Sequence, residues 1–128
     1  WGSAGAISNE FFSGNVVLTF TADQNTGPVM IGLSDGVDTS QHFTDILYAI
    51  YLTGGNVRLY ESGTNRGTFG TFNAGDEFAV VRNGNNIEYY NLTNDATTPL
   101  RVISNAFTGD LYVDSSFGNS GVSLSNVL

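Results

Sequence analysis

The stretch AGDEFAVVRNGNNIEYYN, residues 74–91, contains the strongest fold signal in the chain. Its centre, RNGNN, has Asn-Gly turn chemistry, in which glycine and asparagine supply the positive φ of a tight hairpin. The flanking runs EFAVV and IEYY have the length and residue types of strands. Period-2 alternation in the second run predicts that Ile87 and Tyr89 point into a core and that Glu88 and Tyr90 face the other way. The stretch therefore predicts an antiparallel β-hairpin.

The same pattern continues on both sides of this hairpin. Short apolar runs, spaced about 8–12 residues apart, alternate with turn residues, and we count about ten of them. No window of helical length shows helical spacing with caps. The clearest runs are NVVLTFTA, GPVMIGLS, DILYAIYL, GGNVRLYESG, NRGTFGTF, PLRVIS, LYVDSS and GVSLSNVL. The sequence predicts an all-β fold, a sandwich of two antiparallel sheets in one domain spanning residues 1–128.

The net charge and the small number of cations argue against two classes of partner. The formal net charge is −8, and the four basic residues are all arginines. A nucleic-acid-binding surface needs clustered cations to displace counterions from phosphates, and this chain has too few to cluster. The same shortage argues against docking on anionic lipid. We therefore expect neither nucleic acid nor a membrane as partner, and no run of the sequence is apolar enough for membrane insertion.

Other features indicate the setting of the protein. The 128 residues include 12% charged side chains, about half the usual share, and no cysteine. Gly, Asn, Ser and Thr fill the predicted turns, as in extracellular β-domains. Without cysteine, no disulfide and no thiolate metal site can form. The chain begins at Trp1 rather than Met. These features predict a module or processed piece of a larger secreted bacterial protein.

The order of motifs along the chain matches a known pattern. Over nearly its whole length the chain resembles a repeated module of large bacterial surface and secreted proteins, which belongs to the concanavalin A-like (lectin/glucanase) jelly-roll sandwiches. The motifs are WGSAGAIS, LTFTA, MIGLSDG, TDILYAIYL, VRLYESGTNRGTFGTFNAGDEF, IEYY, LYVDSSF and GVSLSNV. The resemblance implies a jelly-roll fold and a role in adhesion or carbohydrate binding beside other extracellular domains.

One departure from that pattern supplies two candidate ligand contacts. The pattern usually returns to the sheet after a short Asn-Gly turn, whereas here NLTNDATTP (Asn91–Pro99) forms a longer polar loop. A lengthened loop at a sandwich edge is either a recognition element or a neutral insertion. If it is a recognition element, Asn94 and Asp95 are its candidate ligand contacts.

A second candidate site lies in DGVDTSQHFTD. Asp35, Asp38 and Asp45 could supply oxygen ligands to calcium, although the spacing is not that of an EF-hand loop. The preferred interpretation is a solvated loop in which Asp and Ser bond nearby backbone, with calcium as the alternative. His42 has no second histidine or cysteine for zinc, so we interpret it as a surface residue or a ligand contact.

An enzyme is not expected. Glycoside hydrolysis needs two carboxylates flanking the scissile bond, which glucanases of this superfamily place on alternate positions of one strand. The four glutamates, Glu10, Glu61, Glu77 and Glu88, never form that pattern. No Gly-x-Ser-x-Gly elbow exists either.

The residues fit a sugar-binding surface more readily than a catalytic site. Arg58 and Tyr60 share one face of a predicted strand, and Glu88 and Tyr90 share one face of another. If those strands are neighbours, the four side chains form a polar and aromatic patch suited to sugars. The simpler alternative, which we favour, is a cross-strand Arg–Glu pair framed by ordinary sheet tyrosines.

Together these features predict a non-catalytic extracellular recognition or adhesion module that binds a glycan or polysaccharide. The alternative is a structural subunit or tip domain of an appendage, fibre or phage tail. Such a subunit would self-associate as a homo-oligomer through an exposed edge strand.

Overall fold

The computed structural model describes residues 4–12, 15–22, 29–35, 46–107 and 109–117. This part of the chain forms ten β-strands, and no helix occurs in it. The strands are β1 (Ala4–Phe12), β2 (Val16–Thr21), β3 (Val29–Ser34), β4 (Tyr48–Thr53), β5 (Asn56–Glu61), β6 (Thr64–Thr71), β7 (Glu77–Asn83), β8 (Asn86–Asn91), β9 (Arg101–Ile103) and β10 (Leu111–Phe117). The strand predicted at GVSLSNVL lies outside the described residues.

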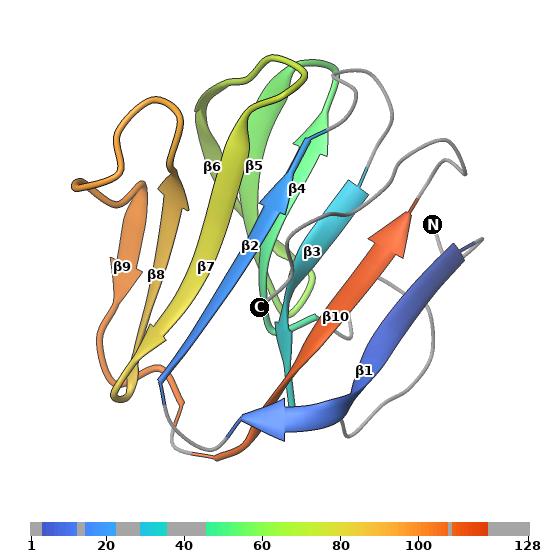
Figure 1. Ribbon diagram of the computed structural model, residues 1–128, viewed down its shortest axis with the longest axis vertical. Coiled ribbons are helices and arrows are strands. Elements are labelled where there is room, and N and C mark those ends of the chain that lie inside the picture. The colour runs from blue at the N-terminus through green and yellow to red at the C-terminus, as the bar shows by residue number, and fades with distance from the viewer. Residues whose placement is uncertain (1–3, 13–14, 23–28, 36–45, 108, 118–128) are drawn as a thin grey trace.

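The strands form two antiparallel sheets. A six-stranded sheet has the order β1-β10-β3-β4-β5-β6, and a four-stranded sheet has the order β2-β7-β8-β9. In Figure 1 the four-stranded sheet lies in front of the six-stranded sheet, and β6 and β9 lie on the same side of the molecule. We call this side the β6–β9 edge. The predicted all-β, two-sheet antiparallel sandwich is confirmed.

The hairpin predicted from residues 74–91 is confirmed as β7–β8. Its register runs from Phe78 opposite Asn91 to Asn83 opposite Asn86, and Gly84 in the turn has a φ of 62°. Only glycine and a few polar residues adopt that conformation at low cost. Ile87 and Tyr89 are buried, while Glu88 and Tyr90 are only half-buried, as the alternation predicted.

The core lies between the two sheets. Alternate residues of each strand point inward, as the pleat requires. Phe78 is central to the packing, because its ring stacks on Phe20 at 5.6 Å and meets Phe72 edge-on at 6.0 Å between ring centroids. The fully buried inward-facing side chains include Leu18, Phe20, Ile31, Leu33, Ile50, Leu52, Leu59, Phe78, Val80, Ile87 and Tyr89.

Strand β4 is covered on both faces. Ile50 and Leu52 belong to the main core, whereas Ala49 packs with Met30 and Ile46 in a smaller cluster on the other face. Neighbouring β3 approaches β4 so closely that a Cβ on Gly32 would lie 1.8 Å from a carbonyl oxygen of β4. A side chain cannot be accommodated there, so the interior of this sheet depends on a glycine.

Strand β6 ends the six-stranded sheet and is irregular. Its register against β5 shifts twice, and Gly67 and Gly70 both have a φ of 119°. Glycine allows such bulges, and bulges at an edge discourage pairing with further strands. The β6 edge is therefore poorly suited to strand addition.

Candidate functional site

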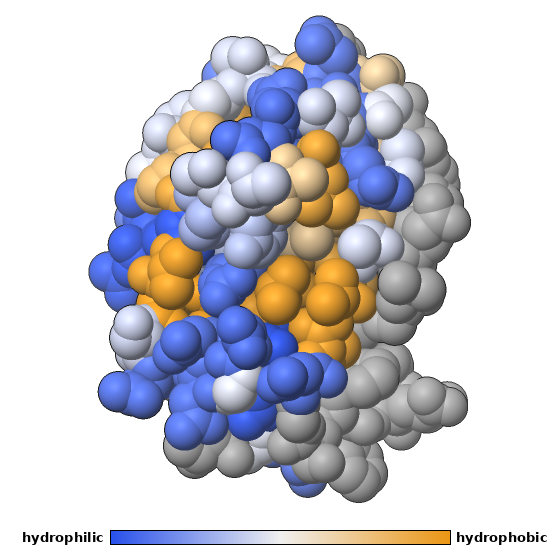
Figure 2. Space-filling model, turned by 60° about the vertical axis from the view of Figure 1, so that its left-hand side comes forward, coloured by the Kyte–Doolittle hydropathy of each residue, from blue (hydrophilic) through white to orange (hydrophobic). Residues whose placement is uncertain are grey.

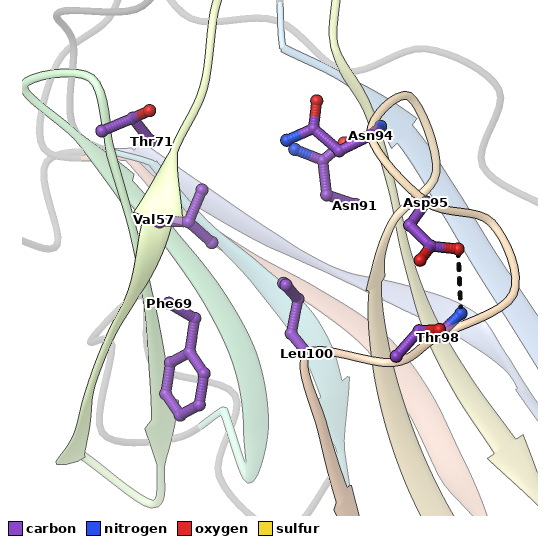
Figure 3. A pocket seen from close by; sticks show the side chains of 9 residues that line it. Val57, Phe69, Thr71, Asn91, Asn94, Asp95, Thr98 and Leu100 are labelled. Atoms are coloured by element: carbon purple, nitrogen blue, oxygen red, sulfur yellow. Dashed lines mark hydrogen bonds between the residues drawn. The ribbon is translucent and has the colours of Figure 1, made fainter.

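A pocket of about 320 Å³ opens at the β6–β9 edge. One wall comes from β5 and β6 of the six-stranded sheet, and the other comes from the end of β8 and the 92–100 loop. Figure 3 shows Val57 and Leu100 on either side of its centre, with Phe69 below and the Asn91 and Asn94 amides above. The lining residues are Val57, Phe69, Gly70, Thr71, Asn91, Asn94, Asp95, Thr98 and Leu100. Both predicted loop contacts, Asn94 and Asp95, therefore lie in one pocket.

Asn91 organises the first half of the loop. Its side-chain Oδ1 accepts hydrogen bonds from the backbone N–H groups of Thr93 (3.1 Å) and Asn94 (3.2 Å). Because these two bonds identify Oδ1 as the acceptor, they also fix where the amide nitrogen lies. Asn91 is 4% exposed, and its Nδ2 has no hydrogen-bond partner among the described residues. The site thus holds a donor of fixed orientation.

Asp95 organises the second half in the same way. Its Oδ1 accepts hydrogen bonds from the backbone N–H (2.9 Å) and hydroxyl (2.8 Å) of Thr97 and from the backbone N–H of Thr98 (3.1 Å). These bonds stabilise the ionised carboxylate and lower the pKa of Asp95 to about 2. Asp95 is therefore an anion and an acceptor at any physiological pH.

The loop is also bonded to the sheet. The backbone N–H of Glu77 donates to Thr93 Oγ1 at 2.8 Å, and the N–H of Leu92 donates to the carbonyl of Glu77 at 2.8 Å. At its far end, the N–H of Leu100 donates to the carbonyl of Tyr89 at 2.6 Å. With both ends fixed, the pocket is formed before any ligand arrives.

The chemistry of the lining suits a small polar ligand with one apolar face. Val57, Leu100 and the Phe69 ring supply apolar surface, and amide, hydroxyl and carboxylate groups surround it. Ligand pockets of about 300–1,000 Å³ with an apolar floor and a few placed polar groups are the usual form of a small-molecule site.

A charged cluster lies at the same edge, and we call it the Glu61 cluster. Glu61 faces inward from β5 and is 8% exposed. Its Oε1 accepts from Arg66 Nε (2.9 Å) and Arg101 Nη2 (3.3 Å), and its Oε2 accepts from Arg101 Nε (3.1 Å) and the Tyr89 hydroxyl (3.3 Å). Burial raises the pKa of Tyr89, and the Glu61 carboxylate raises it further. The cluster joins β5 and β6 of one sheet to β8 and β9 of the other.

The predicted patch of Arg58, Tyr60, Glu88 and Tyr90 does not exist. Arg58 and Tyr60 lie on β5 of the six-stranded sheet, whereas Glu88 and Tyr90 lie on β8 of the four-stranded sheet. Each pair points away from the core, so the two pairs lie on opposite outer faces of the sandwich. The prediction that the four residues meet is wrong, and so is the simpler alternative of a cross-strand Arg–Glu pair. Alternation assigned the faces correctly, but it could not assign the sheets.

Each of the two pairs has a local environment of its own. The Tyr60 ring meets Tyr51 edge-on at 5.1 Å between centroids. The Tyr90 hydroxyl donates to Glu88 Oε1 at 2.6 Å, and this hydrogen bond is the main cause of a raised pKa for Tyr90. A ligand role for any of the four residues stays a prediction.

The acidic stretch is described only in part. Asp35 follows β3 and is half-buried, while Asp38, His42 and Asp45 lie outside the described residues. Within the described ranges, no group of three His, Cys, Asp or Glu side chains is placed to hold a metal ion. The calcium site stays a prediction.

The sequence did not identify three important pocket residues, Asn91, Phe69 and Leu100. Asn91 and Asp95 each begin a segment in which an Asx side chain caps backbone N–H groups two and three residues later. The motifs NLTN and DATT show this chemistry, so Asn91 had a usable signal. Phe69 and Leu100 had none, because either fits an ordinary strand or loop equally well.

No family model matches the sequence, and no curated protein matches it significantly. Solved structures match the fold at 14–17% sequence identity. The TRIM65 PSpry domain aligns with a TM-score of 0.73 and 15% identity over 97% of this chain and 68% of its own. The SPRY domain of human HERC1 aligns with a TM-score of 0.64 and 17% identity over 94% of this chain and 77% of its own. Stonustoxin aligns with a TM-score of 0.66 and 14% identity over 97% of this chain, which spans 22% of the stonustoxin chain.

The described ranges contain no helix of the length and apolar character that crossing a membrane requires. At the identities found, similarity to solved structures bears on fold and not on activity. The chain folds as the same kind of jelly-roll β-sandwich as SPRY domains.

Proposed function

We propose that this chain is a non-catalytic extracellular recognition module that binds carbohydrate in the pocket at the β6–β9 edge. The observation that supports this most directly is the fixed Asn91 amide, whose donor is unpaired among the described residues and lies beside Asn94 and Asp95. Planar amides and a carboxylate suit sugar hydroxyls, and the Phe69 ring offers a surface for a sugar C–H face. A pocket this small holds one or two sugar rings, so single-site affinity is low and repeated modules would multiply it.

The substitution Asn91→Asp tests the site sharply. A carboxylate retains the oxygen that caps Thr93 and Asn94, so the loop keeps its structure, but the donor toward the ligand is lost. We expect the wild-type chain to bind glycans on an array. We expect N91D to lose about ten- to a hundredfold in affinity, measured by titration calorimetry against the strongest hit.

Asn85→Asp is the matched control. Asn85 is exposed in the β7–β8 turn, and Asn91 ends β8, so the length of that strand separates them. N85D adds the same charge and should bind like wild type. If N91D and N85D bind equally, or if no glycan of any class binds, the proposed function is wrong.

A second candidate, self-association, is supported by a different surface. On the outer face of the four-stranded sheet, Val17, Val81, Glu88 and Val102 form one cross-strand row, and Val17 and Val102 are each 45% exposed. Figure 2 shows hydrophobic surface in the middle of the visible face, with hydrophilic side chains above and below it. A stable oligomer at micromolar concentration in light scattering, without any response to glycans, would favour this candidate.

A further inference from the structure

We propose that Arg66 and Arg101 form an anion subsite beside the pocket, so that the ligand is a polysaccharide bearing carboxylate or sulfate groups. This inference rests on the proposed function and names the class of glycan. It concerns the solvent side of the Glu61 cluster, whereas the carbohydrate proposal concerns the amide-lined pocket.

Arg66 has hydrogen-bond donors that its contact with Glu61 does not use. Only its Nε contacts Glu61, at 2.9 Å, so both terminal nitrogens lack a partner within the described residues. Arg101 uses Nε and Nη2 on the same carboxylate and retains Nη1. The two side chains are 45% and 34% exposed, so the remaining donors are accessible to a ligand. The two terminal nitrogens of a guanidinium match the two oxygens of a carboxylate or sulfate.

The local charge is positive although the molecule is acidic. Two guanidinium groups share one carboxylate, which leaves an excess of one positive charge at this point. The net charge of −8 is spread over the whole chain, and at physiological salt such charges are screened beyond about 8 Å. Contact with the arginines therefore outweighs long-range repulsion, which acts mainly on the rate of encounter.

Position connects the subsite to the pocket. Arg66 precedes Phe69 by three residues on β6, a reach of about 10 Å at most, and Arg101 directly follows Leu100. Figure 3 places Phe69 and Asp95 on opposite sides of the pocket. Since Asp95 repels an acidic group on its side, a bound chain would place a neutral ring near Asp95 and its acidic substituent near the arginines.

The Glu61 carboxylate makes the subsite rigid. It holds the Nε atoms of both arginines at 2.9 and 3.1 Å, so the guanidinium groups are oriented before a ligand binds. Preorganised donors lose less entropy on binding than free surface arginines do.

The test compares matched ligands and matched variants. The ligands are polygalacturonate and its methyl ester, and a sulfated galactan and its desulfated form, titrated by calorimetry at physiological salt. The wild-type chain should prefer the acidic member of at least one pair. R66Q should bind the acidic member with about ten- to a hundredfold lower affinity than the wild-type chain. Its affinity for the neutral member should be unchanged. R66K retains the charge but lacks the planar guanidinium, so its loss of affinity for the acidic member should be smaller than that of R66Q.

Arg58→Gln is the control for net charge. Arg58 lies on the outward face of β5, whereas Glu61 faces inward, so R58Q removes the same charge from the opposite face of the sheet and should retain the full preference. An equal loss in R58Q and R66Q, or no preference for acidic ligands in the wild-type chain, overturns the subsite. If neutral glycans bind and N91D weakens that binding while N85D does not, the proposed function stands even when the subsite fails.

Discussion

At the scale of single residues, Tyr89 shows how the core tolerates a polar group. It is the largest fully buried side chain in the described ranges, and its ring packs within the main core. Its hydroxyl donates to Glu61 Oε2 at 3.3 Å, at the point where the core meets the β6–β9 edge. A buried hydroxyl without such a partner would cost about 1–3 kcal/mol.

Tyr89 predicts a loss of stability at alkaline pH. Its pKa is 10.0 in the unfolded chain and is raised in the folded protein by burial first and by Glu61 second. Above pH 10 the unfolded chain has lost a proton that the folded chain keeps, so the free energy of unfolding falls by about 1.4 kcal/mol per pH unit. Below pH 10 Tyr89 is protonated in both states, so the stability that depends on its protonated hydroxyl is fully present there.

The variant Y89F should remove the part of the pH dependence of the free energy of unfolding that Tyr89 contributes. Urea titrations at several pH values between 9 and 11.5 would measure it. Tyr48, whose pKa is raised mainly by burial, remains in the variant, so the slope should fall and not vanish. An unchanged slope in Y89F would show that the hydroxyl is not buried in solution.

At the scale of elements, Arg82 on β7 holds the connection between β9 and β10. Its Nε donates to the carbonyl of Gly84 at 3.1 Å, its Nη2 donates to that of Phe107 at 3.3 Å, and its Nη1 donates to that of Gly109. The side chain is 2% exposed, and its guanidinium lies 5.9 Å from the centre of the Phe107 ring. One inward-facing arginine thus donates hydrogen bonds to carbonyl oxygens of a turn and a connection, which do not take part in strand pairing.

Replacing Arg82 with Gln should destabilise the protein by about 2–4 kcal/mol, because the Arg82 side chain is buried and its charged donors to three backbone carbonyls are lost. The urea midpoint would measure this loss, and limited chymotrypsin digestion should show faster cleavage after Phe107. R58Q, which removes a charge from an outward-facing position, should stay within about 0.5 kcal/mol of wild type. Equal midpoints for R82Q and R58Q would contradict the role of Arg82.

The elements also show what the sequence could predict. Alternation predicted the inward faces of β5 and β8 correctly, because a side chain's face depends only on its neighbours in the chain. Strand partners depend on residues far apart in the sequence, so the assumption that Arg58 and Glu88 lie on neighbouring strands was wrong. The polar loop after β8 was predicted to be either a recognition element or a neutral insertion, and the pocket beside it needs Phe69 from β6, which no local signal connects to the loop.

At the scale of the whole molecule, the Glu61 cluster joins the two sheets at the β6–β9 edge of the sandwich. Apolar contacts connect the sheet interiors, whereas at the β6–β9 edge Glu61 reaches across to Arg101 and Tyr89. Exposed ion pairs usually contribute about 0–1 kcal/mol, and pairs with a desolvated partner contribute more. The contribution of this cluster therefore depends on how strongly each arginine is coupled to Glu61.

Double-mutant cycles between Glu61→Gln and each arginine would measure that coupling. Arg101 makes two hydrogen bonds and is 34% exposed, whereas Arg66 makes one and is 45% exposed. We expect E61Q to cost about 1–3 kcal/mol in urea unfolding, with a coupling of about 1–2 kcal/mol to R101Q and below about 1 kcal/mol to R66Q. Couplings near zero for both arginines would mean that core packing alone holds the sheets together. A larger coupling to Arg66 would mean that its terminal nitrogens also engage Glu61, which would leave fewer donors for an anionic ligand.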